Sequence, residues 1–245
     1  MNDWSALKRL TAARIGLARA GAAVSSQDLL AFQLAHAQAR DAVWREWDAE
    51  ACAAELERRG MASLTVQSRA TDRALYLKRP DLGRRLDEAS AATLMAASEQ
   101  HKPELALILS DGLSAAAVDA HGISTVSAIQ KTLQSAAISC SPVVLARFGR
   151  VALSDEIGHA LGAQVSVIVL GERPGLSAAD SLGIYLTHSP TVGNSDAQRN
   201  CLSNVREPGG LPPSAAAARL LSLLRRSLAA GMSGVLLKDG GPALP

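Results

Sequence analysis

The sequence predicts an α/β protein whose core is a doubly wound, mostly parallel sheet, preceded by an N-terminal helical segment. Three apolar runs support this prediction, at residues 104–109 (ELALIL), 143–147 (VVLAR) and 165–170 (VSVIVL). Their hydrophobicity is continuous rather than alternating, which is typical of strands that are buried on both faces. Helical patterns lie between and beside these runs, at residues 114–119, 125–137 and 155–161.

Further elements extend this alternation at both ends. We expect a strand at residues 64–67, a helix at 82–98 and another strand at 184–187. Residues 213–230 are rich in Ala and Leu and follow a Pro-Pro-Ser turn, which is a typical helix start. Strands that alternate with helices in this way predict a Rossmann-like sheet.

The segment before the sheet is predicted to contain two helices. Ser25 or Ser26 can cap the first, over residues 27–47, and the second covers residues 51–59. The apolar residues of the first helix recur three or four positions apart on one stripe, which comprises Leu30, Leu34, Ala37, Trp44 and Trp47. We expect both tryptophans to pack in the core.

Composition indicates a folded globular protein. Of its 245 residues, 48% are hydrophobic and 20% are charged. No apolar run reaches the roughly 18 residues of a membrane span, and no apolar core follows the basic residues near Met1 as in a secretory signal. The three cysteines are widely spaced, which favours a reducing cytoplasm over a disulfide framework. We therefore expect a cytoplasmic protein that does not bind a membrane.

Several kinds of site lack support in the sequence. The basic cluster near the N-terminus has no interleaved aromatic residues, so it favours protein docking over nucleic-acid binding; it comprises Lys8, Arg9, Arg14 and Arg19. The five histidines are scattered, without the spacing of a metal site. No GxGxxG, GxxxxGKS or GxxxxGKT motif follows a predicted strand, which argues against nucleotide binding through those loops.

A polar loop containing glycine follows each of the three apolar runs. These loops are SDGLS (110–114), FGRV (148–151) and GERPGLSAADSLG (171–183). In open α/β sheets, ligands bind beyond the carboxyl ends of the strands, at the switch in strand order. Turn geometry alone explains SDGLS, but not a Glu–Arg pair at a strand end followed by a long polar loop.

A second concentration of polar residues lies at 195–204 (SDAQRNCLSN). Cys201 within it has two interpretations, a small packed side chain or a nucleophile. A nucleophilic thiol needs a neighbouring base, and no thiol-enzyme signature surrounds His188, the nearest histidine in sequence. Catalytic thiol chemistry is therefore disfavoured.

Taken in order, these segments resemble the small subunit of ethanolamine ammonia-lyase, from Leu7 to about Gly234. The resemblance includes LKRLTAARIGLARAG, LYLKRPDLGRRL, LILSDGLSAAAV and ARFGRVALSDEIGHALGA. The segments GERPGL and RNCLSN are highly specific in combination, although each alone is weak. The stretch DAHG (119–122) has the wrong glycine spacing for a motif that ligates cobalt through histidine.

The resemblance implies a lyase that is active only when this chain assembles with a large subunit. Adenosylcobalamin would lie between the two subunits, and the large subunit would bind ethanolamine, which is converted to acetaldehyde and ammonia by radical chemistry. This chain would form one wall of the cofactor pocket and carry no catalytic residue. Residues 1–62 would then be a helical docking segment, and residues 63–245 the cobalamin-contacting α/β domain.

Carried over by motif, three residues would contact the cofactor. Val151 in FGRV would lie against the corrin, Glu172 in GERPGL would accept hydrogen bonds from its amide side chains, and Cys201 in RNCLSN would pack beside it. An unpaired carboxylate in a crevice is costly, so we expect either the cofactor or Arg173 to satisfy Glu172.

Two other functions remain open at this point. The chain could be a purely structural assembly subunit of a cobalamin enzyme that acts on another amino alcohol. It could instead be a stand-alone Rossmann-like enzyme, although the absent glycine fingerprint argues against this. In some members of the resembled family, a long N-terminal extension is associated with delivery to a bacterial microcompartment. Here the family pattern begins within a few residues of Met1, so enclosure in a microcompartment is left open. The lone subunit is expected to aggregate through its partner-facing surface.

Overall fold

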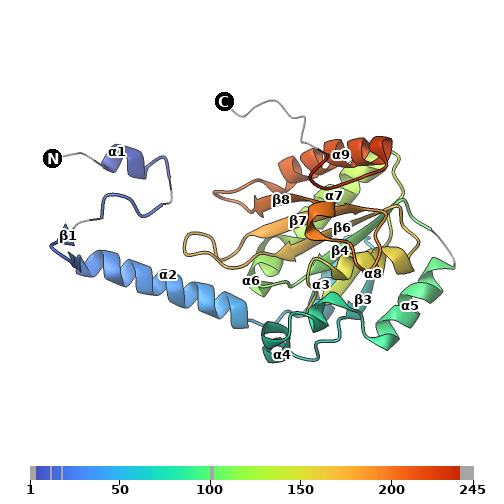
Figure 1. The fold of residues 1–245 in the computed structure, drawn as a ribbon, viewed down its shortest axis with the longest axis horizontal. Coiled ribbons are helices and arrows are strands. Elements are labelled where there is room, and N and C mark those ends of the chain that lie inside the picture. Colours follow the sequence, from blue (N-terminus) through green and yellow to red (C-terminus); the bar gives the residue numbers. More distant parts are fainter. Residues whose placement is uncertain (1–3, 12, 18, 100–101, 238–245) are drawn as a thin grey trace.

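The computed structural model describes residues 4–11, 13–17, 19–99 and 102–237, and a six-stranded sheet lies at its centre (Figure 1). The strands, in spatial order, are β3 (Ser63–Gln67), β5 (Val143–Arg147), β4 (Leu105–Ser110), β6 (Val165–Gly171), β7 (Leu182–His188) and β8 (Arg199–Val205). The first four are parallel, and β7 and β8 are antiparallel to their neighbours. The predicted α/β fold with a mostly parallel sheet is therefore confirmed.

Helices cover both faces of the sheet. On one face lie α3 (Ala49–Arg58), α7 (Ile123–Ser135) and α9 (Pro213–Ala230). On the other face lie α5 (Glu88–Ser98) and α8 (Leu153–Ala160). Alternate residues of β4 enter the two cores, and every residue of that strand is buried. This two-sided burial is the physical reason for the continuous apolar runs.

The long N-terminal helix α2 (Ser26–Trp44) extends away from the sheet, and Figure 1 shows α1 (Ser5–Lys8) and β1 (Arg19–Ala20) at its far end. A short strand, β2 (Ala23–Val24), pairs with β1 and leads into the helix. Ser25 caps α2 by accepting a hydrogen bond from the backbone N–H of Asp28. The C-terminal end of this helix is attached to the α/β domain, where the carbonyl of Val43 accepts a hydrogen bond from Arg73 Nε at 2.7 Å.

The prediction that Trp44 packs in the core is wrong. Trp44 is 54% exposed, whereas Trp47 is 6% exposed and packs in the core with α3. The reason is that Arg45 has an extended backbone, which ends the helix before Trp47. Leu30 and Leu34, from the same predicted stripe, are more than 60% exposed.

The single helix predicted over residues 82–98 is divided. A 3₁₀ turn, η1 (Leu82–Arg84), precedes an extended stretch, and α5 begins only at Glu88. Glu156 of α8 accepts hydrogen bonds from Arg85 Nε (3.0 Å) and from the backbone N–H of Leu86 (2.8 Å), which holds this stretch extended. The division therefore depends on a residue about 70 positions away, which no local pattern reveals.

The remaining predicted helices are present, and the one at residues 114–119 is extended by a π-helical turn. A three-residue α6 (Ala115–Ala117) and a π-helical turn, η2 (Val118–Gly122), run directly into α7. The helix α4 (Arg73–Lys78) lacks a counterpart among the predicted elements. Among the described residues, no helix combines the length and apolarity that membrane crossing requires.

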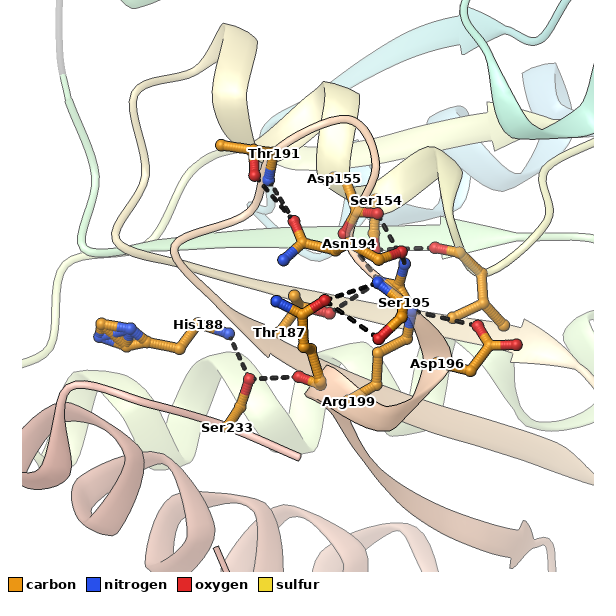
Figure 2. Close-up of polar contacts among 12 residues, drawn as sticks. Ser154, Asp155, Thr187, His188, Thr191, Asn194, Ser195, Asp196, Arg199 and Ser233 are labelled. Atoms are coloured by element: carbon orange, nitrogen blue, oxygen red, sulfur yellow. Dashed lines mark hydrogen bonds and ion pairs between the residues drawn. The ribbon is translucent and has the colours of Figure 1, made fainter. Parts of the chain in front are cut away.

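The strand β8 forms from the polar segment that the sequence singled out, and Arg199 anchors it (Figure 2). The guanidinium donates to both carboxylate oxygens of Asp155 in α8, each at 2.7 Å. It also donates to Thr187 Oγ1 at 2.9 Å and to the carbonyl of Asn194 at 2.9 Å. Both charged side chains are at most 3% exposed, so this pair attaches the antiparallel edge of the sheet to α8.

Candidate functional site

The three polar loops meet at one edge of the sheet. Because β4, β5 and β6 are parallel, their carboxyl ends lie side by side, and Ser110 pairs with both Ala146 and Leu170 there. The neighbouring strands β4 and β5 continue to opposite faces, since α7 packs on one side and α8 on the other. This is a topological switch point, where open α/β sheets form their binding crevice.

A hollow of about 430 Å³ lies at this edge. Its apolar lining comes from Leu113, Val151 and Leu170, and its polar lining from two tyrosines, two arginines, Glu172 and Ser203. Apolar walls with a few converging polar groups are typical of ligand sites. Val151 and Glu172, two of the three predicted site residues, therefore lie on the same hollow.

The FGRV segment is held in place by side chains from elsewhere in the fold. The backbone N–H of Phe148 donates to Asp111 Oδ1 at 2.7 Å, and the carbonyl of Phe148 accepts from Ser68 Oγ at 2.8 Å. Phe148 has a left-handed backbone (φ 54°), a conformation that a non-glycine residue adopts only when its surroundings impose it. These two hydrogen bonds impose that conformation.

The next residue of the segment is held in the same way. The N–H of Gly149 donates to Ser110 Oγ at 3.1 Å, and its carbonyl accepts from the Tyr76 hydroxyl at 3.0 Å. The N–H of Arg150 donates to the carbonyl of Gly83 at 2.7 Å. Val151 therefore faces the hollow from a rigid backbone, which is the arrangement that precise ligand positioning requires.

Close backbone contact explains the glycine that opens the GERPGL loop. The N–H of Leu113 donates to the carbonyl of Gly171 at 2.9 Å, which joins the loops after β4 and β6. A Cβ atom at Gly171 would lie 2.1 Å from the carbonyl oxygen of Ser114 and 2.6 Å from that of Asp111. Only glycine fits there.

Glu172 is hydrogen-bonded by the protein itself. Its Oε2 accepts from Ser181 Oγ (2.7 Å) and from the backbone N–H of Asn204 (3.2 Å), and its Oε1 accepts from Ser203 Oγ (2.5 Å). In the described part of the chain, Glu172 and the exposed Arg173 form no ion pair. Ser203 and Asn204 belong to RNCLSN, so this carboxylate joins the two most specific segments of the sequence.

Cys201 does not line the hollow. It lies opposite Tyr185 in the β7–β8 pairing, and the Tyr185 ring does line the hollow. Local desolvation raises the pKa of the Cys201 thiol, and a hydrogen bond with Tyr185 opposes this only in part. The thiol is therefore protonated near neutral pH, which disfavours a nucleophilic role.

Comparison with known proteins gives the family of this chain. The model of the family "Ethanolamine ammonia-lyase light chain (EutC)" matches residues 1–238. The chain is 50% identical over 240 residues to the ethanolamine ammonia-lyase small subunit of Ralstonia nicotianae, which covers 97% of this chain and 88% of that protein. The small subunits of Pseudomonas putida and Azotobacter vinelandii are 48% and 49% identical to it, over the same shares of each chain. The chain belongs to the ethanolamine ammonia-lyase small-subunit family. The resemblance inferred from its motifs is thereby confirmed.

The hollow of this small subunit is also lined by residues that the sequence analysis did not predict as site residues. Arg150 and Ser203 lie inside the recognised motifs, so their motif membership was an available signal. Tyr76 comes from α4 and Tyr185 from the middle of β7, and nothing in the local sequence marks either as a site residue. Within the described residues, no three His, Cys, Asp or Glu side chains gather in a way that could hold a metal ion.

Proposed function

We propose that this chain forms one wall of the adenosylcobalamin pocket of an ethanolamine ammonia-lyase, and that the large subunit forms the other wall. The observation that carries the proposal is the shared position of Val151 and Glu172 on one hollow, beside the strand that carries Cys201. Three separate family motifs thus converge on one crevice at the sheet edge. When bound, adenosylcobalamin supplies the radical chemistry, and this chain supplies binding and orientation.

The size of the hollow supports a shared pocket. Its volume of about 430 Å³ suits a drug-sized ligand, for which pockets span roughly 300–1,000 Å³. A corrin with its nucleotide and adenosyl groups is larger than such a ligand. The hollow therefore fits one edge of the cofactor, and a second surface must cover the rest.

The donor and acceptor pattern supports contact with the corrin amides. An ionised carboxylate has about four acceptor positions, and three of those on Glu172 are filled by Ser181, Ser203 and Asn204. Oε1 accepts only one of these bonds, so it retains capacity for one amide N–H. Val151 offers apolar contact in the same hollow, and Tyr185, which pairs with Cys201 across β7 and β8, also lines it.

The exposed helix α2 supports docking onto a large subunit, with residues 1–62 as the docking segment. Its apolar side chains cover a length of helix that stands clear of the sheet, and the most exposed are Leu29, Leu30, Phe32, Leu34 and Trp44. Clustered exposed apolar residues typically mark a protein interface. The large subunit would bind ethanolamine, and the complex would act in the cytoplasm, either free or inside a bacterial microcompartment.

Co-expression with the large subunit tests this function. We expect a complex that releases acetaldehyde from ethanolamine only when adenosylcobalamin and both chains are present. Binding of the cofactor is measured separately, by titration followed through its visible absorption. A complex that binds no adenosylcobalamin would contradict the proposal.

One observation favours a second function, that of a structural subunit of a cobalamin enzyme acting on another amino alcohol. Glu172 is already bonded by three groups of its own chain, which is what a purely structural carboxylate requires. Activity of the same complex toward a panel of short amino alcohols separates the two. Turnover of another amino alcohol with none of ethanolamine would favour the second function.

A further inference from the structure

Arg150 lies between two hollows at the sheet edge. It lines the 430 Å³ hollow already described and also a neighbouring one of about 290 Å³. Val151 borders both as well, and the second hollow is otherwise lined by residues that include Arg84 and Asn194. A ligand that lies against Val151 is therefore within reach of the Arg150 side chain.

The Arg150 guanidinium is held in one orientation. Its Cζ lies 4.3 Å from the centre of the Tyr76 ring, and its Nη2 donates to the Tyr76 carbonyl at 3.2 Å. The backbone N–H of Arg150 is fixed by its hydrogen bond to the carbonyl of Gly83. Because the side chain is already ordered, binding through it loses little conformational entropy.

The charge of Arg150 is not matched within the protein. Five other arginines of the α/β domain each form an ion pair with Asp or Glu, namely Arg73, Arg79, Arg85, Arg199 and Arg206. Across the described ranges, Arg150 has no such pair, and its buried Nε has no hydrogen-bond partner. Ordering a half-buried cation without a counter-ion is unfavourable unless a ligand supplies one.

We propose that Arg150 is a further cofactor-binding residue, which donates to an oxygen acceptor of adenosylcobalamin beside Val151. This inference rests on the proposed function. Two groups of the cofactor offer that chemistry, the phosphodiester that joins its nucleotide to the corrin and the carbonyl of a corrin amide. Guanidinium suits both, and the phosphodiester is also the anion that would match its charge. Glu172 as acceptor and Arg150 as donor then hold the same cofactor from two points of one hollow.

The test uses the assembled complex of both subunits and measures binding, not turnover. Adenosylcobalamin is compared with adenosylcobinamide, which lacks the nucleotide and its phosphodiester. The variants are Arg150→Gln and Arg150→Lys, and Arg225→Gln on the exposed surface of α9 is the matched charge control. Circular dichroism and co-purification check that each variant folds and assembles.

We expect Arg150→Gln to weaken adenosylcobalamin binding about 10- to 100-fold, because a hydrogen bond to a charged group is lost. Arg150→Lys should lose less, since it keeps the charge, and Arg225→Gln should bind as the wild type does. If the phosphodiester is the partner, the loss disappears with adenosylcobinamide; if an amide carbonyl is the partner, the loss persists. Both results support the proposal.

Unchanged adenosylcobalamin affinity in an assembled Arg150→Gln complex would overturn it. Should that variant fail to assemble, Arg150→Lys decides in its place, and wild-type affinity for both cofactors would likewise overturn the proposal. A wild-type complex that binds neither cofactor would instead refute the proposed function, and this inference with it.

Discussion

Arg73 and Asp111 form a buried ion pair beneath the FGRV segment, with 3.1 Å between Nη1 and Oδ2. The same arginine donates to the carbonyl of Gly112 (2.7 Å) and to that of Val43 (2.7 Å), in the last turn of α2. Asp111 in turn accepts the N–H of Phe148. One pair of charges therefore connects the C-terminal end of the exposed helix to the backbone that presents Val151.

Asp111 should make stability depend on pH. Burial raises the pKa of its carboxyl from 3.8 to about 6, although Arg73 and the N–H of Phe148 oppose the shift. Because the folded pKa lies above the unfolded one, the stability gained by protonation is complete below about pH 3.8 and is lost as the pH rises through about 6. Relative to Asp111→Asn, the wild type should thus lose up to about 3 kcal/mol of unfolding free energy between pH 4 and pH 7.5. Urea titrations of both proteins at sub-micromolar concentration measure this, and a difference that stays constant with pH would contradict it.

Arg199 and Asp155 should behave as a coupled unit. Either Arg199→Leu or Asp155→Leu leaves one buried charge unpaired, which should lower the free energy of unfolding by about 3–5 kcal/mol. The double variant should cost clearly less than the two single variants together, because no unpaired charge remains. Arg79→Gln breaks an exposed ion pair and should leave the urea midpoint unchanged. Additive single effects would show that the pair is not coupled.

Gly171→Ala should disrupt the loop edge, whereas Gly175→Ala should not. At Gly171, an added Cβ meets two backbone carbonyls that cannot move independently of the loops. At Gly175, its nearest neighbour is the carbonyl of Ala178 at 3.5 Å, an ordinary contact. We expect Gly171→Ala to lose at least about 3 kcal/mol of unfolding free energy and most cofactor binding. Equal stability of the two variants by thermal denaturation would refute the proposed close contact.

Glu172→Gln should weaken cofactor binding without preventing assembly. The side-chain amide keeps one acceptor oxygen for Ser203 or Asn204, but it replaces the other with a donor that faces groups which also donate. We expect about a tenfold loss of adenosylcobalamin affinity in absorption titrations of the complex. Ser177→Ala, on the exposed part of the same loop, is the control. Wild-type affinity of Glu172→Gln would favour the structural role of this carboxylate.

Charged substitutions on α2 should weaken assembly with the large subunit and leave the folding of the α/β domain unchanged. Leu30→Glu and Leu34→Glu change side chains that are 64% and 61% exposed, so the α/β domain should fold as before. We expect less co-purification with the large subunit and less aggregation of the lone chain, as gel filtration measures. Gln38→Glu, exposed on the same helix, is the charge control. Undiminished assembly of both leucine variants would place the docking surface elsewhere.

The local pattern of the chain was enough to predict five of the six strands of the sheet and the edge at which the loops after the parallel strands meet. Strands buried on both faces leave no polar positions, so they appear as continuous apolar runs, and parallel strands bring the loops after them to one edge. The motifs GERPGL and RNCLSN were enough to recognise the family. Because the strands before them are parallel, the loops that carry Val151 and Glu172 could be predicted to meet at one edge.

Only the tertiary structure decided how that edge is held and which side chains remain free. Ser68, Tyr76 and Asp111 bind the FGRV backbone across separations of 80, 73 and 37 residues. Such side chain-to-backbone hydrogen bonds leave no periodicity, so no local pattern could reveal them. The exposure of Trp44 likewise depends on where the chain turns after α2. Two of the three partners of Glu172, Ser203 and Asn204, depend on β8 pairing with β7. These contacts join residues that are distant in sequence, so they stabilise the protein only once the chain has folded.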